Sequence, residues 1–223
     1  TQGGTFVGTS AASDLGLLVS DGANLYAIDQ TGNLVRKASS PFTSWSLVGT
    51  LDTAGDLYSV TSHQGTLVVG LTTSGAPYRV RVSNGGATWS SMSNIPNIDG
   101  NLVSLNGTLF MHGGGTEGRY TTDFGASAWG TLTGAGPSPT AGNVFTAFQN
   151  KIWWVGTNVS AYSADGQAWT TSGTTASGIN EPLPVFARPE SVNGRLYQVT
   201  ALTTAGPINI WASSNGINFS KIG

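Results

Sequence analysis

Short hydrophobic runs rich in β-branched and aromatic residues recur along this chain, and Gly, Asn or Asp separates each run from the next. In one recurring unit, a turn residue is followed by a Leu or Ile that opens such a run. This anchor residue occurs five times, with separations of 42, 42, 43 and 44 residues, at Leu25, Leu67, Leu109, Ile152 and Leu196. A nearly constant period of this length indicates a repeat architecture.

A second unit ends each repeat in an aromatic residue that follows its anchor by 17 to 23 residues: Trp45, Trp89, Trp129, Trp169 and Phe219. Four of these aromatics are preceded by Asn or Asp with a Gly, at residues 84–86, 123–125, 165–166 and 215–216. Asn-Gly and Asp-Gly pairs tolerate the positive φ of a type I′ turn, so they are a strong hairpin signal. Each repeat therefore predicts two successive hairpins.

The hairpins predict four strands in each repeat. We expect strands in the second repeat at residues 57–62, 66–72, 77–83 and 88–92, and in the third at 101–105, 108–112, 119–123 and 128–132. Four antiparallel strands in about 43 residues match the size of a propeller blade. The predicted fold class is all-β, a five-bladed β-propeller of four-stranded antiparallel blades. A β-sandwich or a β-solenoid is the alternative, because both also join short strands through Gly-rich turns.

The repeats divide the chain into blades at approximately residues 15–50, 51–94, 95–134, 135–175 and 176–223, which we expect to form one domain. Residues 1–14, which include Phe6 and Val7, precede the first blade. We expect them to form an extra edge strand or the end of a stalk. Because the chain begins at Thr1 rather than Met, we expect a processed protein or an excised domain.

Charged residues are scarce in this chain. There are 9 Lys and Arg against 11 Asp and Glu, only 9% of the residues are charged, and the net charge is -2. We therefore expect no nucleic-acid partner, because such binders gather Lys and Arg on one face. No apolar stretch is long enough to span a membrane, so we expect no membrane insertion. The absence of Cys excludes disulfides, thiolate metal sites and Cys nucleophiles.

The turn before each repeat's aromatic resembles the Asp-box, or BNR repeat, of sialidase-type propellers, in which Ser/Thr-x-Asp-x-Gly-x-Thr-Trp joins the third and fourth strands of a blade. Residues 82–89 match this form best, with Asn in place of Asp. Residues 163–169 and 213–219 are one residue shorter, and the stretch from 121 to Trp129 is one residue longer. The resemblance implies that the acid or amide caps its own turn and that the aromatic packs between blades. It implies a folding device away from the active face.

The same resemblance raises the hypothesis of a glycosidase. A sialidase-type enzyme would need an arginine cluster for a carboxylate, an acid, and a Tyr nucleophile held by a Glu. The family's N-terminal arginine motif has no match, since the similar residues 186–189 lie before the last repeat's anchor, Leu196, and far from the N-terminus. Arg79 with Arg81 would form only half of a clamp. His63 and His112 lie near turns without a partner at metal-ligand spacing. We therefore expect no enzyme and keep a glycosidase of the sialidase class as an alternative.

In a propeller, the connections from second to third strands and those between blades emerge on one face. Here these segments vary most between repeats, the longest being residues 173–190, and variable loops on a rigid scaffold concentrate binding residues. Aromatic and polar groups near them suit a sugar, whose C–H face stacks on a ring while its hydroxyls form hydrogen bonds. The predicted ligand-binding residues are His112, Glu117, Arg119, Tyr120, Trp154, Asn158, Glu181 and Arg188.

Two further predictions concern tryptophan and calcium. The alternative for Trp153 and Trp154 is structural, with the two side chains alternating between the core and a blade interface. Calcium is the one cofactor that the sequence suggests, at an irregular site formed by Asp52, Asp56 and Asp99 in connecting loops.

Five repeats of this size resemble the five-bladed tachylectin type of lectin. A charge-poor chain rich in Thr, Ser, Gly and Asn also resembles the receptor-binding head of a virion spike, such as that of corticovirus-like phages. These resemblances imply recognition of a cell-surface receptor or glycan, an extracellular or virion-surface location, and an oligomeric spike joined through an N-terminal stalk. Of these functions, we favour that of an attachment protein. A free secreted lectin, a sialidase-class glycosidase and a structural scaffold are the alternatives.

Overall fold

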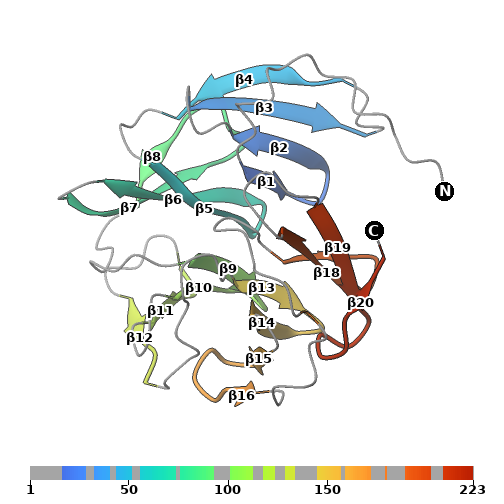
Figure 1. The fold of residues 1–223 in the computed structure, drawn as a ribbon. Coiled ribbons are helices and arrows are strands. Elements are labelled where there is room, and N and C mark those ends of the chain that lie inside the picture. The colour runs from blue at the N-terminus through green and yellow to red at the C-terminus, as the bar shows by residue number, and fades with distance from the viewer. Residues whose placement is uncertain are drawn as a thin grey trace. The chain divides into compact units, whose positions relative to one another are not determined.

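The computed structural model describes residues 17–28, 33–40, 44–51, 56–73, 76–92, 101–112, 118–123, 129–133, 145–156, 159–171, 179, 189–201 and 208–222. Every helix or strand assigned within these ranges is a β-strand. Consecutive strands pair into five four-stranded sheets, which Figure 1 shows by label and colour. The predicted strand or stalk at residues 1–14 lies outside the described residues.

The five sheets are called blades 1 to 5 in chain order. Blade 1 contains β1 (Leu17–Ser20), β2 (Asn24–Ile28), β3 (Leu34–Ser39) and β4 (Ser46–Thr50). Blade 2 contains β5 (Asp56–His63), β6 (Thr66–Thr73), β7 (Ala76–Ser83) and β8 (Ser90–Ser91). Blade 3 contains β9 (Asn101–Leu105), β10 (Thr108–His112), β11 (Gly118–Thr121) and β12 (Gly130–Thr131). Blade 4 contains β13 (Phe145–Phe148), β14 (Lys151–Gly156), β15 (Val159–Ser163) and β16 (Thr170–Thr171). Blade 5 contains β17 (Glu190–Val192), β18 (Arg195–Ala201), β19 (Ile208–Ser213) and β20 (Ser220–Lys221).

Each blade holds one sequence repeat, and within a blade each strand pairs with the next along the chain. The pairing is antiparallel, as between β13, β14 and β15. This is the strand organisation of a five-bladed β-propeller, so the predicted fold class is confirmed and the β-sandwich and β-solenoid alternatives are wrong. The chain divides into two compact units, residues 1–108 with 121–129 and residues 109–120 with 130–223. Every side-chain contact described below lies inside one of these units.

The two recurring units of the sequence occupy fixed places in the blades. Each anchor is the second residue of its blade's second strand, as Leu67 is in β6. Each repeat's aromatic directly precedes the fourth strand, as Trp89 precedes β8. The strands predicted at residues 101–105 and 108–112 are β9 and β10 without change, whereas the predicted fourth strands shorten to two residues in β8 and β12.

The first hairpin of four blades closes through two residues that both have positive φ, as a type I′ turn requires. In blade 3 these residues are Asn106 and Gly107, with φ of 50° and 77°. Residues 64–65, 149–150 and 193–194 follow the same pattern. Asn and Gly tolerate this left-handed conformation best, which explains why they recur just before the anchors.

The prediction of type I′ turns in the second hairpin is wrong. Asn84, Asp165 and Asn215 are not among the described residues with positive φ, and only the glycines that follow them are. These connections are longer loops, such as residues 164–169 between β15 and β16. The side-chain oxygen of the Asp or Asn accepts backbone hydrogen bonds within the loop, so no tight two-residue turn is needed.

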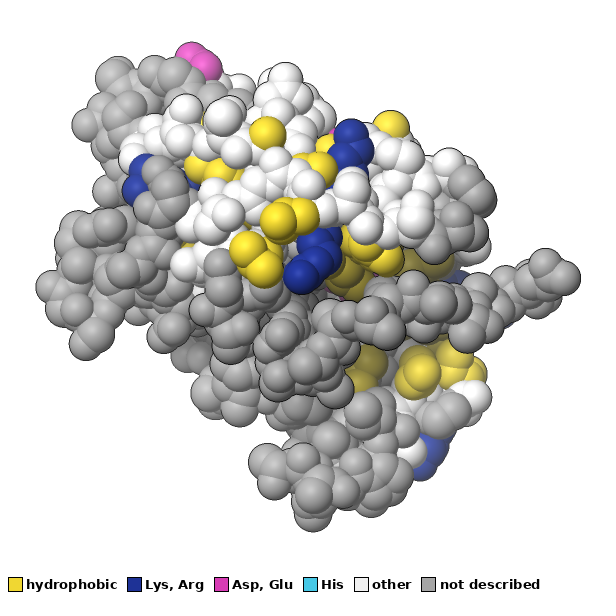
Figure 2. All heavy atoms as spheres, turned by 90° about the horizontal axis from the view of Figure 1, so that it is seen from above, with side chains coloured by type: hydrophobic (Ala, Val, Ile, Leu, Met, Phe, Trp, Pro, Cys, Tyr) yellow, Lys and Arg dark blue, Asp and Glu magenta, His cyan; other side chains and the backbone are white. Residues whose placement is uncertain are grey.

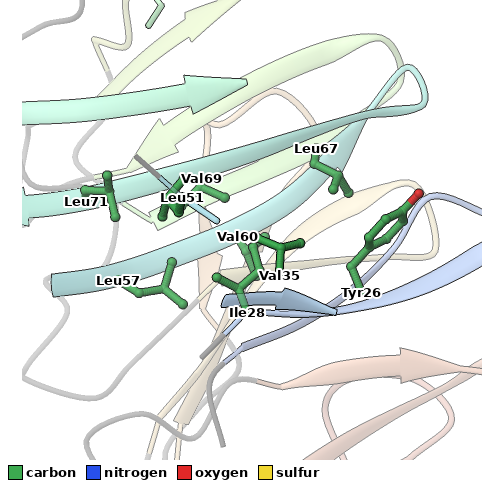
Figure 3. Close-up of a cluster of buried hydrophobic side chains, with 9 residues drawn as sticks. All are labelled: Tyr26, Ile28, Val35, Leu51, Leu57, Val60, Leu67, Val69 and Leu71. Carbon is green, nitrogen blue, oxygen red and sulfur yellow. The ribbon is translucent and has the colours of Figure 1, made fainter. Parts of the chain in front are cut away.

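Blades 1 and 2 share an apolar core (Figure 3). Its nine buried side chains, all at most 2% exposed, are Tyr26, Ile28, Val35, Leu51, Leu57, Val60, Leu67, Val69 and Leu71. The first three belong to strands of blade 1, Leu51 directly follows β4, and the other five belong to β5 and β6. Burying one such side chain stabilises the fold by roughly 1.5–3 kcal/mol. This apolar seam is therefore a main source of stability in the first unit.

The described residues on the face seen in Figure 2 bear few charges. In Figure 2, uncharged polar side chains and backbone cover much of it, with small groups of hydrophobic and basic side chains between them. Its polarity therefore comes largely from hydroxyl, amide and peptide groups. In the part of the chain that the structure describes, no helix has the length and apolar character needed to cross a membrane.

Candidate ligand-binding site

Strand ends of blades 3 and 4 carry several of the residues that the sequence singles out. β10 ends at His112, and β11 begins at Gly118. In blade 4, β13 begins at Phe145 and β14 ends at Gly156. Phe145 is paired with Trp154 near the end of β14, because consecutive antiparallel strands begin and end at the same edge.

An aromatic cluster joins these two blades. The His112 ring stacks on the Phe145 ring, with centroids 4.4 Å apart and an interplanar angle of 28°. The Trp169 ring packs edge-on against His112 and Phe145, at 5.2 Å and 5.6 Å. Trp154 lies beside Phe145 as its register partner. We call His112, Phe145, Trp154 and Trp169 the blade 3–4 cluster.

The cluster is largely buried. His112 is 2% exposed and Trp154 is 7% exposed, so in this structure both pack rather than face solvent. Trp153 is buried as well, and its indole N–H donates to the Phe148 carbonyl at 2.9 Å. Trp153 and Trp154 are therefore both packing residues, as the structural alternative predicts. The cluster fixes β10 against β13 and β14.

The two tryptophans differ in their hydrogen bonding. The indole N–H of Trp154 is buried and has no acceptor among the described residues. Its ring lies against Gly156, where a Cβ would be 2.6 Å from Cη2. A glycine is therefore needed where β14 ends, because any larger residue would displace the ring.

Tyr120 is the predicted ligand residue with an exposed side chain in this region. It is 36% exposed, and its ring lies over Gly130 on β12, where a Cβ would overlap the ring. The neighbouring Arg119 is half-buried, and its guanidinium donates to the carbonyl of Gly118 at 2.8 Å. The two side chains extend to opposite faces of β11, as consecutive residues of a strand do. Tyr120 presents an aromatic surface, while Arg119 is bound to its own strand.

The other predicted site residues cannot be placed. Glu117, Asn158, Glu181 and Arg188 lie outside the described residues, as do Asp52 and Asp99. Asp56 begins β5, but its side chain also lies outside the description. Among the residues that are described, no three His, Cys, Asp or Glu side chains are grouped as a metal site would require. The calcium site stays a prediction.

His63 lies in blade 2 and is also buried, at 1% exposed. Its Nδ1 is 2.8 Å from Oγ of Ser104 on β9. Burial lowers the pKa of His63 below its ordinary value of 6.5, because the imidazolium form would lose its hydration. The side chain is therefore neutral at neutral pH and packs between blades 2 and 3.

Phe145 is the member of the cluster that sequence reasoning missed. It lies seven residues before the anchor Ile152, as Leu102 lies before Leu109. Leu102 is fully buried too. An apolar residue at this place in the repeat is the signal that would have identified Phe145 as a packing residue of the first strand.

No protein-family model matches this chain, and no curated protein matches it with significant similarity.

Proposed function

We propose that this chain is a recognition module that binds a glycan or a receptor on a cell surface and does no chemistry. The observation that carries the proposal is the exposed ring of Tyr120, which lies over Gly130 in the blade whose second strand ends at His112. A tyrosine held in one place offers a large amphipathic surface at a small cost in conformational entropy. Such a ring suits the C–H face of a sugar or an apolar group of a receptor.

The blade 3–4 cluster supports this proposal as a rigid base. Its rings fix the end of β10 and the start of β13 within the second unit. The connections that leave these strand ends can vary in sequence without loss of the packing beneath them. This separation between a packed scaffold and variable connections is typical of binding proteins.

We also assign the repeats to the Asp-box class, and hydrogen bonds in two turns support this. Oδ1 of Asp165 accepts the N–H groups of Gln167 and Ala168 at 2.8 Å and 3.0 Å. Oδ1 of Asn215 accepts the corresponding two N–H groups of blade 5, both at 2.9 Å. This is the capping role that the resemblance implies. Within this class we favour the receptor-binding head of a virion spike, and a free secreted lectin is the alternative.

The test is a binding assay of the purified chain on a glycan array and on whole cells, with and without a calcium chelator. Hydrolysis of a fluorogenic sialoside is followed in parallel. We expect saturable binding without hydrolysis. Hydrolysis would replace the proposal with a glycosidase, and absence of binding in both formats would favour a structural scaffold. Loss of binding on chelation would support a calcium site at Asp52, Asp56 and Asp99.

Two variants test the position of the site. Tyr120→Ala should weaken binding about tenfold or more, since Tyr side chains that a bound partner covers are frequent hot spots. Gly130→Ala keeps the Tyr120 ring but displaces it, and should weaken binding less. Ile222→Ala is the matched control, because Ile222 is an exposed hydrophobic residue of the same compact unit. Unchanged affinity in Tyr120→Ala would move the site away from blade 3.

A further inference from the structure

One place in the repeat holds a different kind of side chain in blade 2. Four residues before the anchor, blades 3 and 4 have the buried apolar residues Leu105 and Phe148. In blade 2 the same place is taken by His63, which is 1% exposed. An apolar side chain would contribute more hydrophobic stabilisation there. Stability alone therefore does not explain the imidazole.

His63 belongs to a polar row on β5 that faces β9. Ser59 Oγ accepts a hydrogen bond from the N–H of Leu102 at 3.0 Å. Nδ1 of His63 lies 2.8 Å from Oγ of Ser104. Ser59 is buried as well. These side-chain hydrogen bonds join blades 2 and 3 along the polar row, whereas an apolar core joins blades 1 and 2 (Figure 3).

The strands packed around His63 carry few charged residues. β6 and β9 have none. β5 has Asp56, and β7 has Arg79 and Arg81, which are paired with Leu71 and Val69. His63 is paired with Thr66 and Arg81 with Val69, so the alternation of side chains directs Arg81 to the opposite face of the blade.

We propose that His63 makes the seam between blades 2 and 3 open locally in acid, while the apolar seam between blades 1 and 2 stays closed. Protonation of His63 would place a charge in a site that is 1% exposed, where the imidazolium loses most of its hydration. Separating β5 from β9 restores that hydration, breaks the side-chain hydrogen bonds of the polar row and exposes apolar side chains of the same seam such as Leu102. Folded proteins open locally in this way at a free energy below that of global unfolding.

The direction of the effect follows from the folded-state pKa. Burial lowers the pKa of His63, so the unfolded or opened state binds the proton more tightly. The contribution of the neutral imidazole to the closed seam is complete above about pH 6.5 and is lost as the pH falls through the folded-state pKa. The seam should therefore be closed at neutral pH and open more often in mild acid.

Amide hydrogen exchange at about pH 7 and about pH 5, corrected for intrinsic exchange, tests this proposal. The N–H of Leu102 reports on the polar seam, because it donates to Ser59 across it. The N–H of Leu51 is the internal control. It donates to the backbone carbonyl of Asn33 at 2.8 Å, and the Leu51 side chain lies in the apolar core. We expect protection of Leu102 to fall severalfold in acid, and protection of Leu51 to change much less.

His63→Leu provides the matched variant, because it copies Leu105 from the next repeat and removes the titrating group. In this variant, the N–H of Leu102 should be equally protected from exchange at both pH values. His63→Gln keeps a polar side chain and should also abolish the pH dependence. It takes the place of the Leu variant in this test if that variant does not fold. Equal protection of Leu102 in the parent chain at both pH values would overturn the proposal. So would an unchanged pH dependence in either variant.

Discussion

The turns before the last strands of blades 4 and 5 have the same structure but different chemistry. In blade 4 the capping group is the carboxylate of Asp165, which also accepts a hydrogen bond from the hydroxyl of Ser163 at 3.0 Å. In blade 5 the capping group is the amide of Asn215, which accepts one from Ser213 at 2.9 Å. The loop therefore needs an acceptor oxygen at this place, and it does not need a charge.

The glycines that follow the two caps have the same backbone conformation but different surroundings. Gly166 and Gly216 both have φ of 74°. A Cβ on Gly166 would lie 3.1 Å from the ring of Phe110 in blade 3. A Cβ on Gly216 would lie 2.5 Å from the ring of Trp153 in blade 4. Each turn thus packs on an aromatic of the preceding blade, and the larger aromatic leaves less room.

The largest effect should come from alanine at these two glycines. The ring of Trp153 cannot easily move, because it is buried and its N–H is bound to Phe148. We expect Gly216→Ala to lower the free energy of unfolding by about 4 kcal/mol, the sum of a left-handed backbone cost and overpacking. Gly166→Ala should lower it by about 2 kcal/mol, since Phe110 needs to shift only slightly. Chemical denaturation at neutral pH measures both.

Gly194 supplies the matched control for this pair. It has φ of 72°, and nothing lies within 4 Å of the place that its Cβ would take. Gly194→Ala should therefore show the backbone cost alone, about 1–2 kcal/mol. If all three alanine variants lose the same stability, packing on the preceding blade adds nothing to the role of these glycines.

A smaller effect should follow from removal of the caps. Asp165→Ala and Asn215→Ala each leave two backbone N–H groups without their acceptor, and each should cost about 1 kcal/mol of unfolding free energy. Asp165→Asn is the control that keeps an acceptor, and it should cost much less at neutral pH. Thermal or chemical unfolding distinguishes these outcomes. Alanine variants as stable as the parent would mean that Gly166 and Gly216 alone shape the loops.

The regular features of the fold could be predicted because they depend on local chemistry. Leu67 and Trp89 mark the second and fourth strands of blade 2 within a residue, since turn glycines and apolar anchors recur with the repeat. The type of turn could not be assigned in the same way. Asn-Gly occurs at Asn106 and at Asn215, but only Asn106 has positive φ. The length of the loop decides this, and the dipeptide alone does not reveal it.

The site was harder to predict, because exposure is decided by the neighbouring blade. In β14, residues 152–156 are all buried, so the strand shows no alternation between core and surface. The chemistry of His112 and Trp154 predicts ligand contacts, but packing between blades 3 and 4 buries both side chains. Tyr120 stays exposed on β11, next to the edge strand β12 of its blade. Its use in binding depends on a ligand that the sequence does not identify.

The charge of Asp165 should produce the smallest difference between the two turns, and only in acid. Hydrogen bonds from the N–H groups of Ala168 and Gln167 lower the pKa of Asp165 below its ordinary value of 3.8. The folded state therefore holds this proton less tightly than the unfolded state. The stabilisation by the carboxylate is complete above pH 3.8 and is lost as the pH falls through the lower folded-state pKa.

Exchanging the two caps isolates this effect from every other titrating group. The difference in unfolding free energy between the parent chain and Asp165→Asn should shift against the parent as the pH falls from about 5 to about 2.5. Asn215→Asp should acquire the same dependence in blade 5, because the new carboxylate would accept the same two N–H groups. Urea denaturation at the two pH values measures each difference. Differences that stay constant with pH would show that the carboxylate binds these N–H groups no better than an amide does. All other acidic groups are the same in the chains compared, so their titration cancels in each difference. A constant difference would therefore mean that the two turns are equivalent in energy as well as in shape.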